Sequence, residues 1–262
     1  MCGRYGQIED SIENFARERN YSYEKERLKI YTNYNLSPGN RTSIVLNDEG
    51  SSKVTDSGIF QFKYSPHSYK GQINIRIEGK EKNEEKSKAA DKNIYDTLNK
   101  DNDPAYAGPY MIDQVGSFQK AFREHRCIIP MDYFYEGPEG VAYKKPFLIK
   151  RKDDKPFAVA GLYRQFYNDH HYYAGILTTV APPLLQKVGH HRSPLLLHKE
   201  KEQLWLNNVL PTQELIKDMV DQVDTSEFKA YPVDAKMRPP NRKDKPNNSV
   251  ELTYPIGDAI EE

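Results

Sequence analysis

The chain has 262 residues, of which 38 are basic and 38 acidic, so its formal net charge at neutral pH is zero. This balance excludes whole-molecule attraction to nucleic acid and leaves that task to local basic patches. A hydrophobic share of 37%, with 19 tyrosines, argues against global disorder. The sequence contains neither a transmembrane-length apolar run nor the apolar segment of a secretory signal. Two cysteines cannot make a disulfide framework, so we expect the reducing cytoplasm. We also expect a monomer and no membrane partner.

The predicted elements are runs of strands with a few amphipathic helices between them. Apolar residues at 8, 12, 15 and 16 share one helical face and predict the first helix. Strands are predicted at 42–46, 58–64, 126–136, 145–151, 156–166, 171–180, 193–197 and 228–233, and helical segments at 117–126, 184–188, 199–208 and 211–223. Regular strand–helix–strand alternation is absent. The pattern favours a single α+β domain over 1–262, built on a mostly antiparallel, curved, barrel-like sheet with flanking helices. Residues 80–115 lack a period and predict a charged surface insertion.

Cys2 is the most informative single residue. Removal of Met1 would place its α-amine, with a pKa of about 7.7–8.0, beside a thiol with a pKa of about 8.5. An aldehyde meeting this pair can form a Schiff base with the amine, and the thiol can then close a five-membered thiazolidine. Intramolecular attack has a large effective molarity, which favours closure. From position alone, however, an ordinary second residue in a frayed chain end is the better interpretation.

The motif that contains Cys2 and four motifs downstream change that interpretation. CGR at 2–4 is followed by YNLSPGN, INIRIEG, FREHRCIIPMDYFYEG and HHRSPLLL, which begin at 34, 73, 122 and 190. Each motif is weak alone, but the set in this order resembles the SRAP family (SOS response-associated peptidases, or abasic-site processing proteins). The resemblance implies covalent capture of abasic sites in single-stranded DNA through the processed N-terminal cysteine.

Residue roles follow from the same resemblance. Cys2 matches the nucleophile, Asn35 the asparagine that holds the terminal residue, Glu136 the proton acceptor and donor beside the α-amine, and His190 a proton shuttle. Opening the closed sugar and dehydrating the carbinolamine both need acid–base help, for which glutamate and histidine are suitable. Weak lyase activity at abasic sites and autoproteolytic removal of Met1 are also expected.

DNA contacts are implied at further positions. The matching residues are Arg4, Asn74, Arg76 and Arg192. The family's Trp-Gly-x-x-Pro-x-Trp segment corresponds here to residues 62–68, which lack both tryptophans and the glycine. Phe62 and Tyr64 could replace them, because base stacking needs only a flat ring. Gly137 also stands where the family commonly has tryptophan, so the chain is a divergent member.

Two basic stretches could add to the DNA surface. Residues 144–155 contain six basic and two acidic groups, and residues 236–245 contain five basic and one acidic. Either stretch alone is typical of a solvated loop. We expect parts of both to hold the strand.

Two alternatives remain open. Class II glutamine amidotransferases also begin Met-Cys-Gly and use the free amine as a base, but their glutamine-binding motifs are absent. A non-catalytic single-strand binding module is the other alternative, and retention of Cys2, Glu136 and His190 argues against it. Cys127 lies in an apolar run and is predicted to be a buried core thiol. Adjacent histidine pairs do not have zinc-site spacing and nucleotide-binding motifs are missing, so no cofactor or metal is expected.

Overall fold

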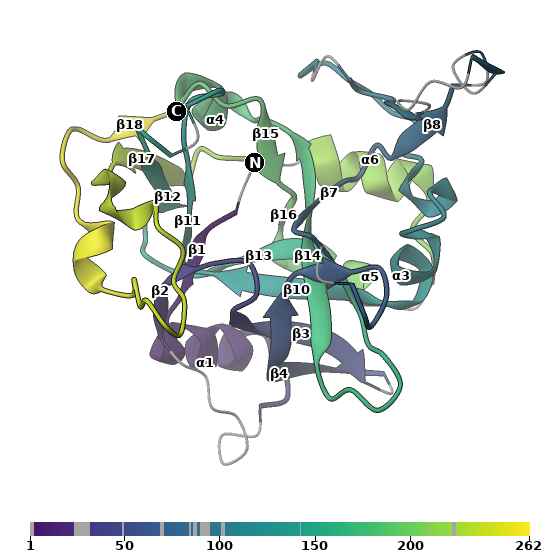
Figure 1. Ribbon diagram of the computed structural model, residues 1–262, viewed down its shortest axis with the longest axis horizontal. Coiled ribbons are helices and arrows are strands. Elements are labelled where there is room, and N and C mark those ends of the chain that lie inside the picture. Colours follow the sequence, from purple (N-terminus) through teal and green to yellow (C-terminus); the bar gives the residue numbers. More distant parts are fainter. Residues whose placement is uncertain are drawn as a thin grey trace.

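The computed structural model describes residues 3–23, 32–48, 50–68, 71–83, 85, 88–89, 95–100, 103–141, 143–207, 209–221 and 224–262. Two large sheets make up most of it, and short helices lie around their outer faces (Figure 1). The architecture confirms the predicted α+β class with extensive antiparallel pairing and strong curvature. Among the described residues, every helix is too short or too polar to cross a bilayer.

The first sheet has six strands, all paired antiparallel. In spatial order they are β18 (Ile260–Glu261), β17 (Phe228–Pro232), β12 (Phe147–Arg151), β11 (Tyr133–Glu136), β1 (Tyr5–Gln7) and β2 (Asn33–Leu36). Neither β1 nor β2 was predicted from the pattern, because three- and four-residue strands show too little alternation. Their position matters most for the site, since β1 lies directly beside β11.

The second sheet closes on itself. Its members are β15 (Arg192–Pro194), β14 (Tyr172–Val180), β4 (Ser51–Phe60), β3 (Arg41–Asp48), β10 (Arg126–Met131), β13 (Phe157–Arg164) and β16 (Leu196–Leu197), with β7 (Asn74–Arg76) beside β14. Because β13 also pairs with β14, five of these strands form a ring. A sheet must curl to close, which explains the barrel-like curvature. Closure also leaves fewer unpaired strand edges.

One apolar run serves both sheets. The segment predicted as a strand over 126–136 is divided at Asp132 into β10 and β11. Asp132 makes the bend by donating its backbone N–H to Gly6 O (3.0 Å) and accepting the Ile8 N–H at Oδ2 (2.7 Å). The run therefore passes from the closed sheet to the open one and ends at Glu136.

The helices pack against both sheets and bury apolar side chains between themselves and the strands. They are α1 (Glu9–Glu18), α3 (Gln119–Glu124), α4 (Pro183–Lys187), α5 (Lys199–Leu206) and α6 (Gln213–Asp221). The first helix has the predicted face, with Ile12, Phe15 and Ala16 buried. Trp205 of α5 is fully buried and donates its Nε1–H to Cys127 O at 2.8 Å. Cys127 is itself fully buried, which confirms the prediction of a core thiol.

Short elements make up the remainder. They are the strands β5 (Phe62–Lys63), β6 (Gly71–Gln72), β8 (Lys80–Lys82) and β9 (Tyr95–Thr97), and the 3-10 turns η1 (Ile112–Gln114), η2 (Ala235–Met237) and η3 (Val250–Thr253). The β8–β9 pair stands away from the sheets at the upper right of Figure 1. It belongs to the predicted insertion, parts of which lie outside the described residues.

Candidate active site and nucleic-acid interface

Glu136 and His190 come together although they belong to different parts of the chain. Glu136 ends β11, and His190 precedes β15, where the turn after α4 returns the chain to the closed sheet. Their side chains are 4% and 6% exposed, and His190 Nε2 lies 3.6 Å from Glu136 Oε2. The structure thus pairs two residues that the sequence predicted to act together.

The hydrogen bond on the other imidazole nitrogen determines the tautomer of His190. Nδ1 lies 2.9 Å from Gly137 O, and because a carbonyl oxygen only accepts, Nδ1 must carry the proton. In a neutral ring, Nε2 then presents a lone pair toward Glu136. This arrangement suits transfer of a proton between the carboxyl group and the imidazole.

Burial shifts both pKa values toward the neutral forms. It raises the pKa of Glu136 from 4.5 to about 7. Burial is also the main reason that the pKa of His190 falls from 6.5 to about 3, and nearby positive charge adds to the effect. Near pH 7, His190 is therefore neutral, and Glu136 is close to half-ionised and can either accept or donate a proton.

The start of the described chain lies beside this pair. Tyr5 pairs with Phe134 and Gly6 with Tyr133 in antiparallel register, and Tyr135 N–H donates to Arg4 O at 2.9 Å. Continuing that register places Gly3 opposite Glu136. Cys2, the predicted nucleophile, lies outside the described residues.

Asn35 lies on β2, the other neighbour of β1. It is fully buried, and its Nδ2 donates to Met237 O (3.0 Å) and Pro239 O (3.1 Å). Its Oδ1 is buried and accepts no hydrogen bond from any described residue. The amide therefore ties the C-terminal segment to β2 and keeps one acceptor available.

A large cavity of about 1590 Å³ extends from the chain start. Its wall includes Gly3, Arg4, Tyr64, Asn74 and Arg76. The motif INIRIEG explains part of this wall, because alternate residues of a strand face opposite sides. Asn74 and Arg76 line the cavity, whereas Ile75 and Ile77 are fully buried in the core behind them.

Two predicted DNA contacts are corrected by the structure. Phe62 is 0% exposed and packs in the core, so its ring cannot stack on a base, whereas Tyr64 is 41% exposed. Arg192 is 1% exposed, and its Nη1 and Nη2 lie 2.8 and 2.9 Å from the two carboxylate oxygens of Glu78. Its guanidinium is thus held in a buried ion pair and is not exposed to contact a DNA strand.

Several site residues were missed by sequence reasoning. Tyr143 accepts the Gly3 N–H at its hydroxyl (2.9 Å) and lines the large cavity. Phe118 also lies on that wall and packs against Tyr64, with ring centroids 6.1 Å apart. Glu78 was seen only as the end of a motif. None carries a local signal, since each acts through a neighbour distant in the sequence.

The amino-acid sequence matches the family described as SOS response associated peptidase (SRAP) over residues 1–240. A match over most of the chain shows that this protein belongs to the SRAP family. The abasic site processing protein YoqW of Bacillus subtilis (strain 168) is 27% identical over 259 residues, which cover 96% of this chain and 98% of YoqW. The abasic site processing protein YoaM of the same organism is 31% identical over 144 residues, or 54% of this chain and 61% of YoaM.

Solved structures share the fold. A crystal structure of a protein from Bacteroides thetaiotaomicron superimposes with a TM-score of 0.65 at 20% identity, covering 97% of this chain and all (100%) of that one. A phage-related protein from Bordetella bronchiseptica gives a TM-score of 0.56 at 19% identity, with coverage of 88% and 94%. At such identities the likeness concerns the fold alone.

Proposed function

We propose that this protein processes abasic sites in single-stranded DNA by forming a covalent adduct at Cys2. The observation that carries the proposal is the buried Glu136–His190 pair, which lies opposite Gly3 at the start of the described chain. A proton donor and acceptor tuned near neutral pH is what capture of an aldehyde by a terminal amine requires. The names of the relatives YoqW and YoaM support the same substrate.

The proposed chemistry begins once Met1 is removed. The Cys2 α-amine adds to the C1′ aldehyde of the opened sugar, and the carbinolamine loses water to give an iminium. The thiolate then attacks the same carbon, forming the C–S bond and returning the electron pair to nitrogen. One water molecule is released overall, and the product is a thiazolidine. Glu136 takes the proton of the amine and returns it to the leaving hydroxyl, and His190 exchanges protons with Glu136.

Positioning falls to the neighbouring strands. We propose that the buried Oδ1 of Asn35 accepts a hydrogen bond from the terminal residue, which matches its lack of a described donor. Arg4 and Arg76 would contact phosphates in the large cavity, Asn74 would add a polar contact, and Tyr64 would stack on a base. A slow β-elimination from the iminium and autoproteolytic removal of Met1 belong to the same proposal, because both use the Glu136–His190 pair.

The test is a denaturing gel of the protein, confirmed by mass to begin at Cys2, mixed with a single-stranded oligonucleotide carrying one abasic site. We expect a slowly migrating, heat-resistant band with the wild type and none with Cys2→Ala. An intact oligonucleotide and Cys127→Ala serve as controls; Cys127 is the other cysteine, and its replacement should leave the band unchanged. Absence of the band from processed wild-type protein would refute the covalent step and favour a plain binding module. Glutamine hydrolysis would instead indicate an amidotransferase.

A further inference from the structure

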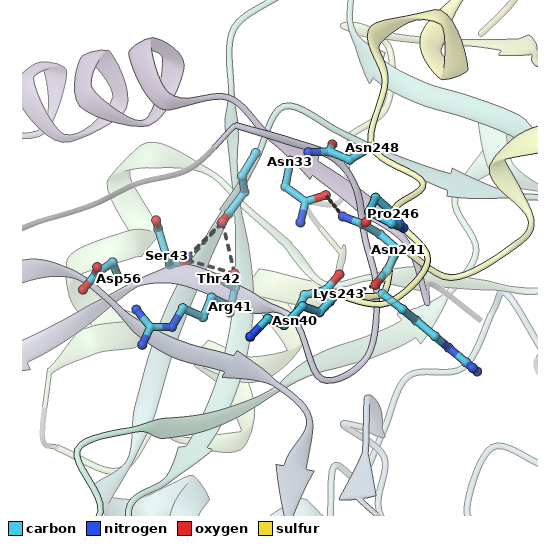
Figure 2. Close-up of a pocket in the computed structure, with 12 residues that line it drawn as sticks. Asn33, Asn40, Arg41, Thr42, Ser43, Asp56, Asn241, Lys243, Pro246 and Asn248 are labelled. Carbon is cyan, nitrogen blue, oxygen red and sulfur yellow. Dashed lines mark hydrogen bonds between the residues drawn. The ribbon is translucent and has the colours of Figure 1, made fainter.

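A second, smaller cavity lies next to the proposed lesion site. Its volume is about 340 Å³, at the low end of the range for small-molecule sites, about 300–1,000 Å³. Arg41 and Asp56 lie on one side, and Asn241, Pro246 and Asn248 lie on the other (Figure 2). The turn at 37–40 separates this cavity from the large one, because Pro38 borders the large cavity and Asn40 the small one.

The cavity is built from amides that are already hydrogen-bonded. Asn241 Nδ2 donates to Asn33 Oδ1 (3.2 Å, Figure 2), Asn40 Nδ2 donates to Asn241 O (3.0 Å), and Asn248 Oδ1 accepts the Tyr34 N–H (2.6 Å). These contacts fix the 241–248 segment to β2 and to the turn before β3. This wall of the cavity is thus preorganised, which lowers the entropic cost of binding a ligand.

Three cations line this cavity without an ion-pair partner among the described residues. Arg41, Arg242 and Lys243 form no ion pair with any described residue, and Asp56 is the carboxylate among the lining residues. The other basic stretch, 144–155, is different. There Lys150 pairs with Asp154 (2.6 Å), and Arg151 with Asp153 (2.8 Å) and with Glu227 (2.7 Å). Among the described residues, these three cations therefore differ from the basic groups of 144–155 in forming no ion pair.

A continuous set of contacts joins this cavity to Arg4. Arg4 Nη1 donates to Ser37 Oγ (2.6 Å), and Ser37 Oγ also accepts the Asn241 N–H (3.0 Å). After burial, the charge of Arg242 helps to lower the pKa of Arg4, so these two cations lie close enough to repel one another. An anion between them would relieve that repulsion.

We propose that the cavity lined by Arg41, Arg242 and Lys243 binds backbone phosphate of the same DNA strand, on one side of the abasic site. This inference rests on the proposed function and extends it by a second phosphate-binding site. A strand leaving the large cavity over the turn at 37–40 would enter the smaller one. Guanidinium and ammonium groups are the usual protein partners of phosphate oxygens.

The test compares Arg242→Ala/Lys243→Ala with Lys245→Ala, a matched change in the same loop at a residue outside the cavity lining. Affinity for a long, lesion-free single strand is measured by fluorescence anisotropy over a salt series. Loss of two phosphate contacts should lower the slope of log K against log salt by about 1.4 and weaken binding about 5- to 20-fold near 0.1 M salt. Lys245→Ala should stay close to wild type.

Abasic oligonucleotides give the second arm. The double variant should form adduct with a trinucleotide centred on the lesion at the wild-type rate. Among longer abasic strands, it should lose affinity for those extended on one side of the lesion and not for those extended on the other side. An unchanged salt slope, an equal loss in Lys245→Ala, or a slowed trinucleotide adduct would overturn the proposal. Loss of inorganic phosphate binding with unaltered strand binding would overturn it too, since the cavity would then serve a free anion. A wild type that forms no adduct would instead refute the covalent function, which the lesion-free measurements do not assume.

Discussion

The carboxyl group of Glu136 meets two opposing demands. Burial favours its neutral form, whereas taking a proton from an amine requires the carboxylate. A pKa of about 7 leaves both forms populated near neutral pH, so one side chain can act first as base and then as acid. His190, held neutral with its Nε2 lone pair toward Glu136, can exchange the proton without adding a charge to the buried site.

The pH dependence of adduct formation should reveal this role. As the pH rises through about 7, Glu136 ionises and the rate should increase in the wild type. Glu136→Gln should be about 100-fold slower, as expected for loss of a general base, and should keep only the inflection of the terminal amine at about 7.7–8.0. Single-turnover gel time courses across neutral pH measure both quantities. Equal profiles for the two proteins would exclude Glu136 as the base.

Single residues also show where sequence patterns mislead. Phe62 and Tyr64 are both aromatic and two positions apart, so the pattern treats them alike. The structure buries Phe62 against Phe118 (ring centroids 5.4 Å apart) and leaves Tyr64 at the cavity. Residue type indicated the chemistry of a stacking platform, but only packing decided which ring is accessible.

At the scale of elements, the site depends on strands that belong to different sheets. β10 and β11 were predicted as one strand, and its end at Glu136 was correct. The bend at Asp132 was not predicted, because its cause is a pair of hydrogen bonds with β1 and the residue after it. That bend aligns β11 with β1 and so brings Glu136 opposite Gly3.

The Glu78–Arg192 pair connects two further elements of the site. Glu78 follows β7, which carries Arg76, and Arg192 begins β15 just after His190. Because both groups are buried, removing one leaves an uncompensated charge. We expect Glu78→Gln to lower the free energy of unfolding by about 3–5 kcal/mol. Urea denaturation measures the change.

A double variant distinguishes this ion pair from simple packing loss. Glu78→Leu/Arg192→Met removes both charges, and its destabilisation should be smaller than the sum of the two single changes. Additive effects would mean that the two side chains do not depend on each other, which would contradict a coupled, buried ion pair.

At the scale of the whole molecule, the chain closes one sheet into a ring and pairs the strands of the other in an open row. Zero net charge means that any attraction for DNA must come from local groups. The two basic stretches look alike in sequence, but Lys150 and Arg151 of the first pair with carboxylates, whereas Arg242 and Lys243 of the second line a cavity and form no ion pair with a described residue. Charge composition alone could not separate them.

Overall stability should depend on pH through Glu136. Its pKa is about 7 when folded and near 4.5 when unfolded, so its contribution to stability is complete below about pH 4.5 and is lost as the pH rises through 7. Glu136→Gln lacks this loss. We expect this variant to be more stable than the wild type at pH 8 by about 3 kcal/mol and nearly equal to it at pH 4.

Urea unfolding of both proteins at the two pH values tests this. Asp132, whose pKa burial raises to about 6, titrates in both proteins and therefore cancels in the comparison. A stability difference that does not change with pH would mean that the Glu136 carboxyl is not strained by burial.

The sequence by itself determined the strand-rich α+β class, the longer elements and the residue types at the site, because apolar periodicity and short motifs are local properties. It also pointed to Glu136 and His190 and to the resemblance that the family match confirmed. Only the tertiary structure decided that Arg192 and Phe62 are buried, that Asn35 ties down the C-terminal segment, and that residues 241–248 wall a second cavity. Burial and pairing depend on partners far along the chain, and a linear pattern does not contain them.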